Sequence, residues 1–178
     1  MKTDNKEFIP TPDHCREILK EAGCSDQVIC HCEAVRDVAL RIVKRTKADK
    51  NLVEAGALLH DIGRSKTHGI DHGFVGACIA RKLGLSERIV SIIETHIGAG
   101  LTASVARSFG LPDKDFIPKT LEEKIVCHAD NLVDDYSRQD IEFEVERALQ
   151  ENNKNYALQL VKLHKEISDL IGMDANKV

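Results

Sequence analysis

The sequence contains no tryptophan, and only 4% of its 178 residues are aromatic. Surfaces that stack nucleic-acid bases need aromatic side chains, so this composition disfavours such a platform. The net charge of −4 provides no basic excess to attract nucleic acid or an anionic membrane. No apolar run approaches the roughly 18 residues of a transmembrane helix, and residues 1–9 are too polar for a secretory signal. We therefore expect a cytoplasmic protein with no membrane or nucleic-acid partner.

The cysteine pattern lacks the spacing of a thiolate metal site. None of the six cysteines forms a Cys-x-x-Cys pair. Cys30 and Cys32 flank His31, but residues two positions apart on a helix lie about 200° apart around its axis. We expect reduced thiols that pack as small core or boundary residues, rather than ligands of a zinc knuckle.

Apolar residues recur with helical spacing almost everywhere, and no segment alternates with a period of two. Residues that cap helix N-termini stand at the expected helix starts: Thr11, Ser25, Asp71, Ser86 and Thr120. The pattern predicts one all-α domain over residues 1–178, with about seven or eight helices. Its core spans about residues 25–136, and C-terminal helices over residues 138–172 pack on that core.

The segment from residue 97 to residue 119 differs from the rest because it contains three glycines and two prolines. Long connections of this kind are uncommon unless they serve a function. The segment directly follows His96 and leads to the helix that carries Asp130. We expect it to act as a lid or specificity loop; the alternative is a plain surface connection.

The most informative feature is a set of polar residues on, or at the ends of, apolar helix faces: His31, His60, Asp61, His72, His96 and Asp130. Each has a structural explanation when taken alone, because a single histidine can be a satisfied core residue and a single aspartate can pair with an arginine. An unpaired buried carboxylate, however, costs several kcal/mol unless it binds a metal. Together the six residues predict a site for one or two divalent ions of Fe, Mn, Co, Ni or Zn.

The order of these residues resembles a known family. His31, the pair His60-Asp61 and then Asp130 match the H…HD…D pattern of the HD-domain metal-dependent phosphohydrolases, and the string from His60 to Gly63 is their HDIG variant. The segments Asp71–Ala77 and Glu94–Gly98 resemble those of six-ligand members, which include bacterial diadenosine-tetraphosphate hydrolases. The resemblance implies a single helical HD domain.

The same resemblance implies a ligand set. One metal ion would be held by His31, His60, Asp61 and Asp130, with Asp61 bridging to a second ion. The second ion would be held by His72 and His96. The remaining histidines match no role in the family pattern: His14, His68, His128 and His164.

The activity implied by the resemblance is hydrolysis of a phosphoester or phosphoanhydride by metal-activated water, with a nucleotide or dinucleotide as the expected small substrate. Two divalent ions about 3.5–4 Å apart can activate water and clamp phosphate oxygens. Asp61 or Asp130 can orient the attacking water. Arg64, three residues after Asp61, is the expected catalytic and phosphate-binding cation. Lys66 and Lys119 are further candidates for binding substrate phosphate.

Two alternatives fit the same residues. A non-catalytic metal-binding module for sensing or assembly would use the ligands without the chemistry, and an activity assay would separate it from the hydrolase. An HD-type oxygenase with a di-iron site would use the six-ligand pattern, and iron content with dioxygen consumption would identify it.

Overall fold

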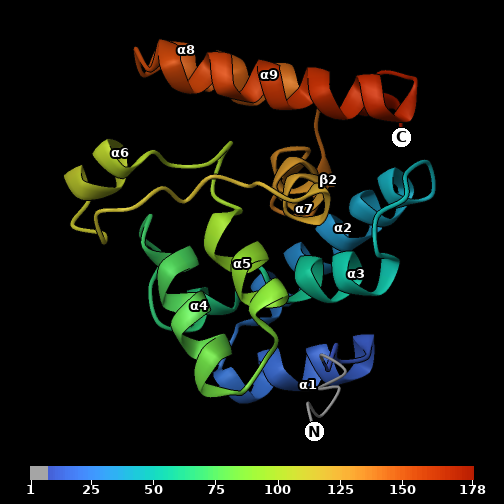
Figure 1. Ribbon diagram of the computed structural model, residues 1–178, viewed down its shortest axis with the longest axis vertical. Coiled ribbons are helices and arrows are strands. Elements are labelled where there is room, and N and C mark those ends of the chain that lie inside the picture. Colours follow the sequence, from blue (N-terminus) through green and yellow to red (C-terminus); the bar gives the residue numbers. More distant parts are fainter. Residues whose placement is uncertain (1–7) are drawn as a thin grey trace, which may run out of the picture.

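The computed structural model describes residues 8–178, so the prediction about residues 1–9 falls almost entirely outside the described residues. Nine α-helices form most of this part of the chain (Figure 1), one or two more than expected: α1 Pro12–Ala22, α2 Asp26–Val43, α3 Lys50–Leu59, α4 His72–Lys82, α5 Glu87–Thr95, α6 Ala103–Ser108, α7 Leu121–Asn131, α8 Ile141–Gln150 and α9 Lys154–Ile171. Two short 3-10 helices accompany them: η1 Ile62–Ser65 and η2 Ala175–Lys177. The predicted all-α class is confirmed. No helix in the described residues is long and apolar enough to span a membrane.

Side-chain caps begin most helices where the sequence places them. A backbone N–H of the first turn donates a hydrogen bond to each of four predicted caps: Thr11, Ser25, Ser86 and Thr120. Asp71 precedes α4, but it makes no such bond. Its carboxylate instead accepts a hydrogen bond from the Thr67 hydroxyl, 2.9 Å away. The predicted cap at Asp71 is therefore wrong, because this carboxylate closes the loop before α4.

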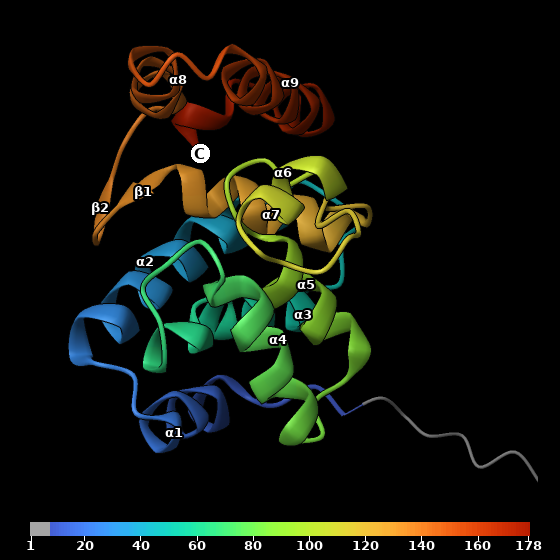
Figure 2. The same cartoon turned by 90° about the vertical axis from the view of Figure 1, so that its left-hand side faces the viewer.

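The core surrounds α3, in which seven of ten residues are buried. This helix packs against α1, α2, α5 and α7, and their apolar faces form one large hydrophobic cluster. Gly56 allows α3 and α5 to approach closely, since a Cβ there would lie 2.7 Å from Cδ1 of Ile92. α4 packs on α5, while α8 and α9 lie side by side with α9 on α7. The C-terminal helices thus cover the end of the molecule opposite α1 (Figures 1 and 2).

The segment that follows α5 has a small core of its own. It contains α6, and its two arms meet at an isolated bridge between Leu101 and Phe116. Its buried apolar side chains form a separate cluster that packs against Phe74 of α4: Leu101, Ala106, Leu111 and Phe116. The segment is therefore a packed subregion with its own buried side chains, and not an open loop.

A short β-hairpin joins α7 to α8. Strands β1 (Val133–Asp134) and β2 (Ser137–Arg138) are antiparallel, with Val133 opposite Arg138 and Asp134 opposite Ser137. The turn residue Asp135 has a positive φ of 52°. The sequence analysis did not predict this hairpin, because two-residue strands are too short to produce an alternating pattern.

Candidate metal centre

Five helices supply the six predicted ligands. His31 lies within α2, His60 and Asp61 follow α3, His72 is the first residue of α4, His96 follows α5, and Asp130 lies near the end of α7. His60 and His96 are almost completely buried, and Asp61 is 2% exposed. All six side chains converge, as three overlapping groups of donor atoms within 4.8 Å show: His31 with His60 and Asp61, His60 with His96 and Asp130, and Asp61 with His72 and His96.

Each of the four histidines is oriented by a backbone carbonyl. The Nδ1 atoms of His60, His72 and His96 each lie 2.7 Å from the carbonyl oxygen three residues earlier in the chain. Nδ1 of His31 lies 2.5 Å from the carbonyl oxygen of Asp135, in the hairpin turn. Because a carbonyl oxygen only accepts, each Nδ1 carries the proton and each Nε2 presents a lone pair to the cluster. This is the arrangement in which histidines bind metals.

The Nε2 atoms face the two carboxylates. Nε2 of His31 lies 2.9 Å from Oδ1 of Asp130, and Nε2 of His60 lies 3.4 Å from the same oxygen. Oδ1 of Asp61 is 3.1 Å from Nε2 of His72 and 3.5 Å from Nε2 of His96. Asp61 also approaches the first group, because its Oδ2 lies 3.8 Å from Nε2 of His60. Asp61 thus lies between the two groups of histidines, as a bridging ligand would.

The cluster is not satisfied by its own hydrogen bonds. Nε2 of His72 and Nε2 of His96 are 3.0 Å apart, although neither carries the proton in the tautomers described above. Nε2 of His60 and Oδ1 of Asp61 are buried without a hydrogen-bond partner. Facing lone pairs and unpaired buried acceptors are unfavourable unless a cation lies among them. The donor set of imidazole nitrogens and carboxylate oxygens therefore fits divalent transition-metal ions.

The ionisation of these groups points in the same direction. Burial opposes ionisation of Asp61, but its histidine neighbours, His60 first and then His72 and His96, outweigh burial and hold its pKa well below the usual value. Burial likewise opposes ionisation of Asp130, yet His60 and His31 lower its pKa. Burial disfavours a charged His60, but Cys32, Asp61 and Asp130 raise its pKa well above the usual value. The site therefore demands positive charge at its centre.

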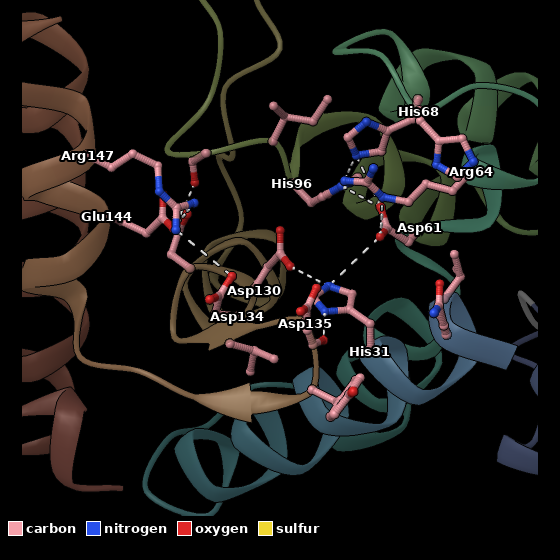
Figure 3. A pocket seen from close by; sticks show the side chains of 18 of the residues that line it. His31, Asp61, Arg64, His68, His96, Asp130, Asp134, Asp135, Glu144 and Arg147 are labelled. Atoms are coloured by element: carbon pink, nitrogen blue, oxygen red, sulfur yellow. Dashed lines mark hydrogen bonds and ion pairs between the residues drawn. The ribbon is translucent and has the colours of Figure 1, made fainter. Parts of the chain in front are cut away.

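The cluster opens into a cavity of about 520 Å³. His31, Asp61, His72, His96 and Asp130 line one side of it, and Figure 3 shows the side chains of Asp130 and His31 facing each other. Arg64 also lines this cavity, and its Nε lies 2.6 Å from Oδ2 of Asp61. Of the predicted site residues, the structure thus brings together the six ligands and Arg64.

Two predicted phosphate-binding residues do not join this group. Lys66 is absent from the cavity lining, and its Nζ lies 3.4 Å from the carbonyl oxygen of Ala22. Lys119 lines a different hollow, beside Lys124 and Glu166. Within the segment 97–119, only Ile97 and Gly98 line the main cavity. The rest of that segment is not placed as a cover over the cluster.

Several cavity residues had no role in the sequence analysis. His68, which matches no family position, lies on the cavity wall near Arg64 (Figure 3). The opposite wall comes from the hairpin and the C-terminal helices: Asp134, Asp135, Tyr136, Glu144, Arg147 and Tyr156. The sequence offered no signal for these residues, since tertiary packing alone brings them to the ligands. No cysteine of the described residues belongs to the ligand groups.

The fold and the cluster define an all-α protein with a histidine–aspartate cluster that could hold a metal ion. A family model described as "HD domain" matches residues 28–134, and the chain belongs to that family. The ligand pattern predicted from sequence lies within this range. The six-ligand subgroup remains a proposal.

The relatives of this chain carry different names. Over 171 residues it is 44% identical to a protein of Picrophilus torridus named tRNA (cytidine(56)-2′-O)-methyltransferase. The match covers 96% of this chain and 50% of that protein, so the chain spans about half the length of this relative. An uncharacterised protein of Methanocaldococcus jannaschii is 45% identical over 161 residues, which cover 86% of this chain and 95% of that protein.

A solved structure shares the fold. The HD domain of the phosphodiesterase PgpH from L. monocytogenes superimposes with a TM-score of 0.53, covering 88% of this chain and 94% of that one. The two sequences are 17% identical, so the likeness concerns the fold alone.

Proposed function

We propose that this chain is a metal-dependent phosphohydrolase that acts on a phosphoester or phosphoanhydride of a nucleotide or dinucleotide. The observation that carries the proposal is the orientation of the cluster: four imidazoles present unprotonated Nε2 atoms to two ionised carboxylates at the wall of a cavity. Membership of the HD domain family supports it.

In this proposal His31, His60, Asp61 and Asp130 hold one divalent ion, while His72 and His96 hold a second, with Asp61 shared. When bound, such ions neutralise phosphoryl oxygens and activate water for attack. The positive charge of the ions is required for phosphate binding, because five carboxylates and only two arginines line the cavity. A phosphate group would otherwise be repelled from the ligand cluster.

The carboxylates of Asp61 and Asp130 have different roles in the proposed reaction. The side chain of Asp61 is 3% exposed and lies between the histidine groups, which suits a ligand. The side chain of Asp130 is 22% exposed and reaches the cavity, so it can accept a hydrogen bond from an attacking water and orient it. Arg64 donates a hydrogen bond from Nε to Oδ2 of Asp61. Its terminal nitrogens remain available to donate to a phosphoryl oxygen beside the metal cluster.

The test is a screen of the metal-reconstituted protein against mononucleotides, dinucleotides, cyclic nucleotides and model phosphoesters. The variants His60→Ala and Asp61→Ala should lose both bound metal and hydrolysis, because each removes a buried ligand. His14→Ala, which removes an exposed histidine on α1, is the matched control and should retain both. Variants at His60 and Asp61 that keep full metal content and activity would contradict the proposal.

A second candidate is an RNA substrate. The name of the Picrophilus relative concerns tRNA, and this chain corresponds to about half of that protein. In this candidate the same metal cluster hydrolyses a phosphate ester of an RNA end, and the expectation of no nucleic-acid partner does not hold. Adding RNA oligonucleotides and tRNA transcripts to the screen decides between the candidates. A preference of at least tenfold in kcat/KM for RNA over mononucleotides would favour this one.

A further inference from the structure

Most of the cavity wall that faces the metal ligands lies beyond the residues matched by the HD family model. The model ends at residue 134, whereas Glu144 and Arg147 come from α8 and Tyr156 from α9. Figure 3 shows Arg147 and Glu144 on one side of the cavity and Arg64 on the other, with Asp130 between them. This wall is therefore a property of this chain's C-terminal helices, and it is the natural place for a determinant of substrate choice.

Arg147 and Arg64 are the only arginine or lysine residues among the described residues that line the cavity. Arg64 is committed to the ligand cluster through Asp61. Arg147 is half-exposed, and its Nη1 lies 2.9 Å from Oε1 of Glu144. Its Nη2 lies 4.0 Å from Oδ1 of Asp134, another residue that lines the cavity. A guanidinium held in this way points over the cavity and presents a fork that suits a phosphate group.

We propose that Arg147 binds a second phosphate group of the substrate, one that is not hydrolysed. This inference rests on the proposed function, because the first phosphate must lie at the metal cluster. The second anion needs its own cation, since the remaining charges on this wall are the carboxylates Asp134, Asp135 and Glu144. Glu144 can release Arg147 without losing all its partners, because Nε2 of Gln139 also donates a hydrogen bond to Oε1 of Glu144 at 3.1 Å.

Tyr156 connects the helix pair that carries Arg147 to the segments that carry the proposed ligands. The Tyr156 ring packs so closely on Gly98 that a Cβ at this glycine would lie 2.6 Å from Cε2 of the ring. Gly98 follows the ligand His96 by two residues, and its carbonyl accepts a hydrogen bond from Nδ2 of Asn131, the neighbour of Asp130. The α8–α9 pair is thus held in register with two ligand-bearing segments. A cavity of about 520 Å³ between these walls has the size of a nucleotide-binding pocket and exceeds the needs of one phosphoryl group.

The experiment compares two dinucleotides that differ by one phosphate. The dithymidine TpT and its 5′-phosphorylated form pTpT contain the same internucleotide linkage, and both are used with a phosphorothioate linkage to slow cleavage. Binding to the Mn²⁺-loaded protein is measured by calorimetry for the wild type, Arg147→Ala, Arg147→Lys and Arg107→Ala. Arg107, on α6, is the matched control because it also forms an ion pair but does not line the cavity. Its Nη1 lies 3.3 Å from Oδ2 of Asp113.

The wild type should bind pTpT about tenfold more tightly than TpT, as expected for one charge-assisted contact. Arg147→Ala should reduce this ratio to about one, Arg147→Lys should retain part of it, and Arg107→Ala should leave it unchanged. A wild-type ratio near one, or a ratio that persists in Arg147→Ala, would overturn the inference. Failure of the proposed function looks different: the wild type would then hydrolyse no phosphoester, whatever the binding ratio.

Discussion

The four histidine ligands differ in what orients them. His60, His72 and His96 each donate from Nδ1 to a carbonyl three residues earlier, so their own segment fixes the ring. His31 uses the carbonyl of Asp135, which is 104 residues away in sequence. The first three are therefore oriented by local structure, and the fourth by the tertiary fold.

In the proposed two-ion site, the pair His72 and His96 determines whether a second ion binds. Their Nε2 atoms face each other across 3.0 Å beside Asp61, whereas Nε2 of His31 lies beside Asp130. We expect two ions per chain at saturation, and about one in the double variant His72→Ala/His96→Ala. Elemental analysis of the purified proteins measures this. A wild-type stoichiometry that never exceeds one, even with excess metal, would restrict the site to four ligands.

Cys15 offers a test of burial through its ionisation. Burial raises the pKa of this thiol from 9.0 to about 12. The unfolded chain releases this proton near pH 9 and the folded chain does not, so the contribution to stability is complete below pH 9 and is lost as the pH rises towards 12. Iodoacetamide at about pH 9 should label the exposed Cys30 and spare Cys15 until the chain unfolds. Mass spectrometry that finds Cys15 labelled first would contradict this.

Among the elements, the hairpin between α7 and α8 has the most direct effect on the metal centre. Its turn residue Asp135 adopts a positive φ and supplies the carbonyl that orients His31. Glycine accepts this backbone conformation readily, whereas a β-branched residue resists it. The backbone of one turn thus acts on a ligand in α2.

Substitution of Asp135 tests this connection. Asp135→Gly should keep metal affinity near that of the wild type, whereas Asp135→Val should shift the carbonyl and weaken metal binding by about tenfold. Both variants remove the same carboxylate from the cavity wall, so their difference isolates the backbone. Competition with a fluorescent metal chelator measures the affinities. Equal affinities for the two variants would show that the turn does not position His31.

The helices were predictable because their signals are local. Caps such as Ser25 and Thr120, and a ligand such as His31 on an apolar face, can be recognised from a few neighbouring residues. The hairpin was too short to give a pattern, and Lys119 was expected at the site because it precedes the helix of Asp130. The structure places Lys119 in another hollow, because proximity along the chain does not decide which side of a helix a residue faces. Arg147 could not be predicted, since only the packing of α9 on α7 brings α8 to the cavity.

For the whole molecule, the distribution of the proposed ligands predicts that metal binding would raise global stability. The ligands come from α2, α4, and the ends of α3, α5 and α7, so an ion connects most of the core elements. A metal ion that binds only the folded chain raises the free energy of unfolding. The increase is about 2.7 kcal/mol when the concentration of free ion is a hundred times its Kd. Without the ion, the buried acceptors of His60 and Asp61 are left unpaired.

Chelation should therefore lower the melting temperature by about 5–10 °C, the shift expected for a domain of this size. Re-addition of Mn²⁺ should restore it. The variant His60→Ala serves as the control, because its melting temperature should not respond to the chelator. Calorimetric scans of the two proteins with and without chelator make the comparison. A wild-type melting temperature that changes with neither the chelator nor Mn²⁺ would show that metal binding at the cluster does not contribute to global stability.

The distance along the chain between His31 and the Asp135 carbonyl has a consequence for synthesis on the ribosome. His31, His60, Asp61, His72 and His96 emerge first, and the last three histidines can adopt their orientation as soon as their own segments form. Asp130 and the turn at Asp135 follow much later. A nascent chain that ends before residue 130 carries most of the donor atoms, but it lacks Asp130 and the Asp135 carbonyl that orients His31. The complete proposed metal site would therefore form only after α7 and the hairpin have left the ribosomal tunnel.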